Sequence, residues 1–317
     1  MKYNPKTLYG AIGIAISLGL LNTWRYCPHP EVRFFLLRAL SVRYLPDPAE
    51  GILLTHPPLP LLFALSFREH FPLITGWTAT FFLFLVGMRQ GNALPLLCVL
   101  SSPAFLLGAL SRPALVLFSL FAAFGFSAIL VGAQEKGYEK LPLGNLVFGF
   151  GACVHPLGFW LLPLFVLCEV LAFPMSLPRR GTLAVIASLP FLILQSMGLF
   201  FGWVYEGYAL SPFRNPERSL GTFLQSWVVP PHAADTNILL ALPILLVSPF
   251  LGLRHAIPLW GILALSLFVP RLTAPYASLL PALLLALRPE PKEVTFSGLL
   301  AWNALGWALV LFGFFPC

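Results

Sequence analysis

Apolar runs recur along nearly the whole chain, and they constrain its fold more than any other feature. Hydrophobic residues make up 58% of the 317 residues and charged residues only 10%, whereas soluble domains carry about 25% charged residues. The hydrocarbon core of a membrane admits only helices and closed barrels, and these runs lack the alternation that is typical of barrel strands. The composition therefore predicts an all-α integral membrane protein without a soluble domain.

A helix that crosses a membrane needs about 20 apolar residues. On this criterion we predict a polytopic bundle of about eleven spans in a single domain, residues 1–317. The predicted spans are 8–24, 71–88, 93–110, 113–133, 142–155, 158–175, 181–201, 237–253, 256–270, 275–287 and 297–315. The first run has no small-x-small cleavage site, so we expect a retained helix rather than a signal peptide.

The distribution of lysine and arginine predicts the orientation. With the N-terminus in the cytoplasm of a plasma (inner) membrane protein, all five lysines fall inside, provided that residues 57–67 do not cross. Nine arginines then lie outside: Arg25, Arg33, Arg38, Arg43, Arg68, Arg112, Arg214, Arg218 and Arg271. The guanidinium fork suits phosphate, so this set suggests an anionic, phosphate-bearing ligand. The alternative is that these side chains reach lipid headgroups or pair with nearby acids.

Two outer loops are long, 25–56 and 202–236. In the first loop, "EVRFFLLRALSVRYL" places Phe34, Leu37 and Leu40 at helical spacing, which predicts an amphipathic helix that lies along the membrane surface. The second loop carries Trp203 and Trp227, and tryptophan is favoured at membrane interfaces.

The surface helix is followed by "HPPLPLLFAL" from His56, and this order resembles the opening of the GT-C glycosyltransferases. The protein O-mannosyltransferases and the lipid A aminoarabinose transferases are the nearest in pattern. Three later segments are similar to that family: "SSPAFLLGALSRPALVLFSLFAAF", "GFGACVHPLGFWLLPLFVL" and "VPRLTAPYASLLPALLLAL". The resemblance covers about residues 8–287 and rests on order and spacing. It departs at Pro30, which stands where the family has its catalytic Asp, and leaves only the neighbouring Glu31.

The resemblance implies transfer of a sugar from a polyprenyl-phosphate carrier to an acceptor lipid, glycan or protein at the outer face. Such a reaction needs a carboxylate for the acceptor hydroxyl and cations for the leaving phosphate. Glu31 is the candidate carboxylate; its alternative role is that of an acid in the first turn of a helix. His56 is expected either to orient the acceptor or to cap the helix that follows it.

Arg271 is the preferred phosphate ligand, with Arg68 and Arg112 behind it and with His155 and Tyr276 as further binding residues. His155 could equally serve the structure at a helix break. Glu169 lies within a predicted span, and an acid there is a candidate functional group. No spacing such as HxxxH is present, so we predict no metal ligands, although some members of the family use a divalent metal at the phosphate.

Two other classes of function compete with the glycosyltransferase. A catalytically silent GT-C-like subunit that binds lipid or a membrane-protein partner is suggested by the missing Asp at Pro30. A transporter ranks last, because the sequence has no inverted repeat and few polar residues within its spans. Nothing in the sequence predicts binding of nucleic acid.

Overall fold

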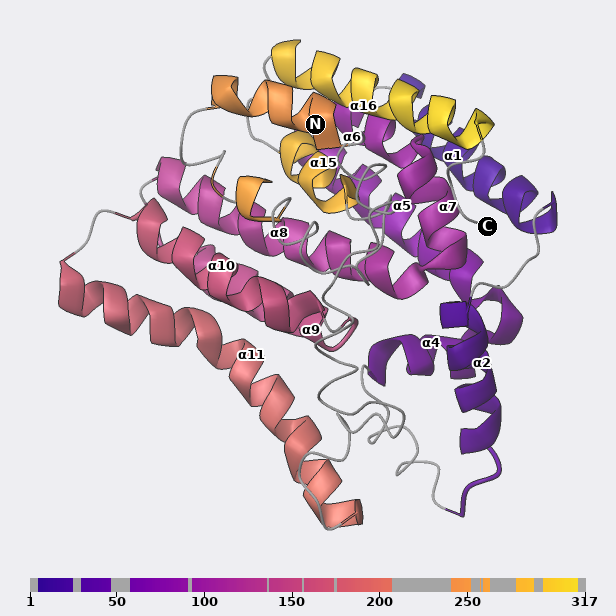
Figure 1. Ribbon diagram of the computed structural model, residues 1–317, viewed down its shortest axis with the longest axis horizontal. Coiled ribbons are helices and arrows are strands. Elements are labelled where there is room, and N and C mark those ends of the chain that lie inside the picture. The colour runs from indigo at the N-terminus through magenta and orange to yellow at the C-terminus, as the bar shows by residue number, and fades with distance from the viewer. Residues whose placement is uncertain are drawn as a thin grey trace.

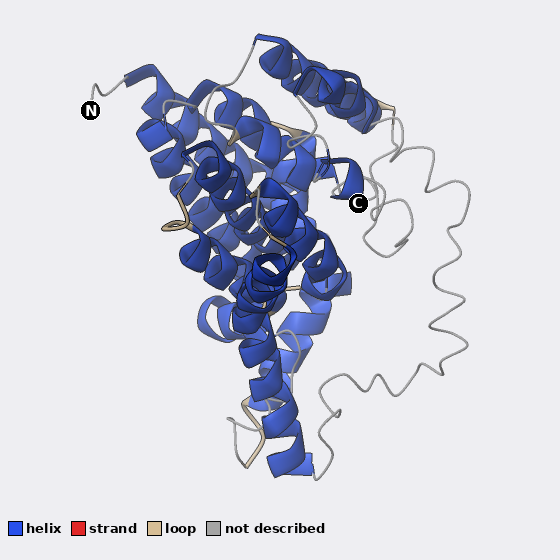
Figure 2. Ribbon diagram, turned by 90° about the vertical axis from the view of Figure 1, so that its left-hand side faces the viewer, coloured by secondary structure: helices blue, strands red, loops and turns tan. Residues whose placement is uncertain are grey.

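The computed structural model describes residues 5–24, 30–46, 58–90, 93–135, 137–155, 157–173, 176–206, 241–251, 257, 259–262, 278–287 and 293–312. These residues form helices and their connections, and no strand occurs among them (Figure 2). Glu31 is described in its backbone only, and His56, Arg271 and Tyr276 lie outside the described residues.

The longer helices run side by side as a bundle (Figure 1). Their bounds are α1 Pro5–Trp24, α2 Pro30–Val42, α4 Pro58–Phe67, α5 Phe71–Gln90, α6 Ala93–Leu100, α7 Pro103–Ser111, α8 Pro113–Glu135, α9 Leu141–Ala152, α10 Leu157–Ala172, α11 Leu177–Glu206, α15 Leu279–Ala286 and α16 Glu293–Leu311. Two 3-10 turns, η1 Arg68–His70 and η3 Ser248–Leu251, are also described, and residues 241–247 and 259–262 are helical as well.

Within the described residues, three helices are long and apolar enough to cross a membrane: Pro113–Glu135, Pro178–Tyr205 and Glu293–Leu311. The bent pair α6 and α7 makes a fourth if it is counted as one span. The described residues thus contain three or four candidate spans, which supports a membrane protein, and the predicted bundle of about eleven spans is not confirmed. Of the other predicted spans, 8–24, 142–155 and 158–175 correspond to the shorter apolar helices Leu8–Thr23, Leu141–Gly151 and Leu161–Ala172. The predicted span 71–88 corresponds to α5, and the rest fall partly outside the described residues.

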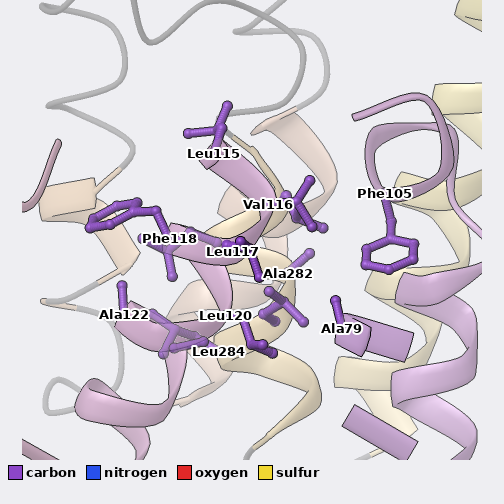
Figure 3. Packing of buried hydrophobic residues seen from close by; sticks show 14 of the residues in the cluster. Ala79, Phe105, Leu115, Val116, Leu117, Phe118, Leu120, Ala122, Ala282 and Leu284 are labelled. Carbon is purple, nitrogen blue, oxygen red and sulfur yellow. The ribbon is translucent and has the colours of Figure 1, made fainter. Parts of the chain in front are cut away.

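Helix α8 is the centre of the bundle. Along it, Leu115, Leu117 and Phe118 are each at most 5% exposed. Figure 3 shows these side chains beside Ala282 and Leu284 of α15, with Phe105 of α7 close by. A helix that is apolar on every side is buried in this way only inside a larger bundle.

Glycine allows α9 to pack closely against its neighbours on two sides. A Cβ at Gly144 would lie 2.6 Å from the Cβ of Ala128 on α8, and a Cβ at Gly149 would lie 3.1 Å from the backbone nitrogen of Phe191 on α11. Small residues at such crossings are the usual means by which membrane helices approach one another, because lipid supplies no hydrophobic drive for association.

The predicted span 93–110 is not one straight helix. Helices α6 and α7 meet at an angle of 56° at Ser101 and Ser102, ahead of Pro103. Asn303 of α16 donates to the carbonyl of Cys98 at 2.9 Å and to Ser101 Oγ at 2.9 Å, and Trp307 Nε1 donates to the carbonyl of Ser101 at 3.2 Å. Helix α16 therefore satisfies the backbone groups that the bend frees, as a membrane interior requires.

Antiparallel packing gives the bundle two ends. The Arg112 end carries α2, the start of α8 and the turn between α9 and α10; the Lys140 end carries the turn between α8 and α9 and the start of α11. Figure 1 shows α2 running across the direction of α8 and α16 at the Arg112 end. The basic residues whose side chains are described divide between these ends: Arg33, Arg38, Arg43, Arg68 and Arg112 against Lys140, Arg179 and Arg180.

We predict that Gly144→Leu destabilises the protein by about 1–3 kcal/mol, because the larger side chain overfills the contact between α9 and α8. The matched control is Gly13→Leu on α1, where a Cβ meets nothing within 4 Å. The measurement is the midpoint of thermal unfolding in detergent. Equal midpoints for the two variants would contradict the assigned crossing.

Candidate functional site

The turn between α9 and α10 places His155 at the Arg112 end of the bundle. The turn is closed locally, since the backbone nitrogens of Val154 and His155 both donate to the carbonyl of Gly151, at 2.9 and 3.2 Å. The imidazole of His155 packs against the ring of Phe118 on α8, with 5.9 Å between the ring centroids. The half-buried His155 is thereby held beside the first turns of α8.

Arg112 links α7 to α8 and lies near the α9–α10 turn that holds His155. Its backbone nitrogen donates to the carbonyl of Gly108 at 2.7 Å, which closes α7, and its carbonyl accepts from Val116 at 3.2 Å, which opens α8. Pro113 follows as the first residue of α8, where proline costs little. The half-buried guanidinium of Arg112 is therefore fixed at a helix junction next to His155.

Electrostatics couple these two side chains. Burial, and after it the positive charge of Arg112, lower the pKa of His155 from 6.5 to about 3. His155 is consequently neutral at physiological pH, where its imidazole can donate one hydrogen bond and accept another. The pair thus combines a permanent cation with a neutral hydrogen-bonding group.

The proline-headed helix α4 docks against this turn. The backbone nitrogen of Leu59 donates to the carbonyl of Cys153 at 3.2 Å. Pro58 and Pro60 have no N–H, so the first three residues of α4 keep no free backbone donor. The start of this helix therefore joins the site as an apolar wall and not as an anion-binding helix N-terminus.

The prediction that residues 57–67 do not cross the membrane agrees with the length of the helix formed there. Helix α4 has ten residues and is about 15 Å long, roughly half of a hydrocarbon core. That length also separates Arg68, which follows the far end of α4, from the turn that holds His155. The structure brings Arg112 and His155 together and leaves Arg68 apart from them.

The described residues contain no group of three His, Cys, Asp or Glu side chains that could hold a metal ion. Glu31 is the second residue of α2, at the Arg112 end, and Pro30 is the first. Arg271 as a phosphate ligand, His56 as an acceptor residue and Tyr276 as a binding residue stay predictions, because all three lie outside the described residues.

Sequence reasoning missed the partner of Glu169. The carboxyl group of Glu169 on α10 is fully buried and lies against Asn145 of α9, which is 2% exposed. When the side-chain amide of Asn145 is oriented so that its nitrogen faces these acceptors, it donates to Glu169 Oε2 at 2.8 Å and to the carbonyl of Leu141 at 3.3 Å. The available signal was a lone Asn within the apolar "LPLGNLVFGFGA".

The fold and this arrangement define an all-helical membrane protein with a basic and imidazole site at one end of its bundle. Comparison of the chain with known protein families, with curated proteins and with solved structures gives no match.

His155 makes the stability of the protein depend on pH. Its pKa is lower in the folded state, so its contribution is complete above pH 6.5 and is lost as the pH falls toward 3. We predict that stability in detergent declines below pH 6.5 by about 1 kcal/mol for each pH unit, and that His155→Gln flattens this decline. An unchanged slope in the variant would contradict the assignment.

The buried pair of Asn145 and Glu169 leads to a second prediction about stability. Asn145→Leu leaves the carboxyl group of Glu169 buried without a partner and should cost about 1–3 kcal/mol. The double variant Asn145→Leu/Glu169→Leu should recover much of the loss, because no polar group remains unsatisfied. Unfolding of each variant in detergent and SDS measures the difference, and strictly additive losses would argue against the pairing.

Proposed function

We propose that this protein is a glycosyltransferase that moves a sugar from a polyprenyl-phosphate carrier to an acceptor at the outer membrane face. The observation that carries the proposal is the meeting of Arg112, the α9–α10 turn with His155 and the start of α4 at one end of the bundle. These segments are far apart in the sequence, and each belongs to a stretch that resembles the GT-C family.

The chemistry of the site fits the task. As the sugar leaves its carrier, negative charge grows on the phosphate, and a fixed guanidinium such as that of Arg112 stabilises this charge. Neutral His155 can accept a hydrogen bond from a hydroxyl of the sugar or the acceptor. Glu31, on the helix that crosses this end, is the proposed carboxylate for the acceptor hydroxyl. The carrier tail is proposed to lie in the surrounding bilayer.

A catalytically silent subunit is the second candidate. It is favoured by Pro30, which stands in place of the acid of the resemblance and serves as the first residue of α2, a position that suits proline. A transporter is less well supported, because the carbonyls freed at the bend between α6 and α7 are bonded by α16. In transporters, carbonyls at such a break coordinate ions.

The test is sugar transfer by the purified protein in lipid, with a panel of polyprenyl-phosphate sugars as donors. We predict that Arg112→Gln lowers kcat/KM about 10²- to 10³-fold through loss of charge stabilisation, and that Glu31→Gln and Arg271→Ala also lower it. The matched control, Arg179→Gln at the Lys140 end, should transfer sugar at the wild-type rate.

Two outcomes would count against the enzyme. Equal kcat/KM for the wild type and Arg112→Gln would remove Arg112 from the reaction. No transfer from any donor, combined with carrier binding that Arg112→Gln abolishes, would favour the silent subunit.

A further inference from the structure

A second basic feature lies where α2 and α4 end, apart from Arg112 and His155. Arg43 follows the last residue of α2, and its Nη2 donates to the carbonyl of Leu65 in the last turn of α4 at 3.1 Å. Arg68 comes three residues after Leu65 and begins η1. Both arginines are exposed, and they define what we call the Arg43–Arg68 corner.

The arginines of the corner have no carboxylate partner among the described residues. Within the described part of the chain, neither arginine forms an ion pair, and the adjacent Glu69 lies 3.7 Å from His70 Nε2. Arg68 has a φ of 52°, a left-handed conformation that a non-glycine residue adopts at a cost. Arg68 therefore follows the end of α4 to which Arg43 is bonded, and the positive charges of both residues attract an anion to this place.

An apolar stripe leads away from the corner along α2. Phe34, Leu37 and Leu40 are 53%, 66% and 52% exposed, and Tyr44 continues the stripe past the helix. The opposite face of α2, which includes Phe35, is buried. Helix α2 is therefore apolar on two faces, of which the protein covers one. The exposed stripe beside two cations has the chemistry of an amphiphile-binding surface.

We propose that the Arg43–Arg68 corner binds the phosphate group of an anionic membrane phospholipid, with an acyl chain along the stripe of Phe34, Leu37 and Leu40. Guanidinium groups bind phosphate oxygens in pairs of hydrogen bonds. A soluble phosphate would use the corner but not the stripe. The site is separate from Arg112 and His155, because the full length of α4 lies between them.

The experiment is native mass spectrometry of the protein in detergent, with phosphatidylglycerol or phosphatidylcholine added at equal concentration. We expect the wild type to retain about tenfold more phosphatidylglycerol than phosphatidylcholine. We expect Arg68→Gln to retain about tenfold less phosphatidylglycerol than the wild type, which corresponds to about 1.4 kcal/mol for one charged contact. Leu37→Asn should weaken retention too. The matched control is Arg179→Gln, an exposed arginine at the start of α11, and it should retain the lipid as the wild type does.

Arg68→Gln is the decisive variant, because the side chain of Arg68 makes no hydrogen bond to the described residues. Arg43→Gln, by contrast, also removes the hydrogen bond to the carbonyl of Leu65. Equal losses in Arg68→Gln and Arg179→Gln would overturn the proposal, since any surface charge would then serve. Full displacement of phosphatidylglycerol by millimolar inorganic phosphate, or no effect of Leu37→Asn, would overturn the lipid part. Sugar transfer is not measured, so failure of the proposed enzyme activity leaves this test intact.

Discussion

The close approach of α9 to α8 decides where the remaining elements of the candidate site can lie. At Gly144 the absence of a side chain lets α9 contact Ala128 directly, and the two helices stay together from the Lys140 end to the Arg112 end. The α9–α10 turn consequently lies beside the first turns of α8, where His155 is close to Phe118 and Arg112. A wider crossing would move the turn, and with it the docking point of α4.

At two places inside the bundle, polar groups are bonded by side chains of another helix. The bend between α6 and α7 frees carbonyl groups, and Asn303 and Trp307 of α16 donate to them. Glu169 is buried, and Asn145 donates to its carboxyl group. Such pairs cost little in stability while both partners remain, and they leave a buried polar group unsatisfied when one is removed. They therefore fix which helices pack together.

Periodicity and composition predicted the helices better than their contacts. Helices α8, α2 and α4 were each expected from local pattern, since that information lies in consecutive residues. The 56° bend was missed, because Ser101 and Ser102 look like two small polar residues within one apolar run. Arg112 and His155 were each predicted, but their meeting was not, because it depends on the crossing at Gly144. The buried face of α2 was missed for the same reason, as Phe35 is buried by helices distant in sequence.

The prolines of α4 leave the start of this helix without free N–H groups for an anion. A helix N-terminus ordinarily offers free N–H groups and a positive dipole to phosphate. In α4, Pro58 and Pro60 lack that donor, and the N–H of Leu59 is bonded to Cys153. Removing these donors allows the helix to start against another turn within an apolar environment, because no unsatisfied N–H is buried there. The positive charge that flanks α4 then comes from Arg112 near its start and from Arg43 and Arg68 at its end, so the length of α4 sets the spacing between these two basic sites.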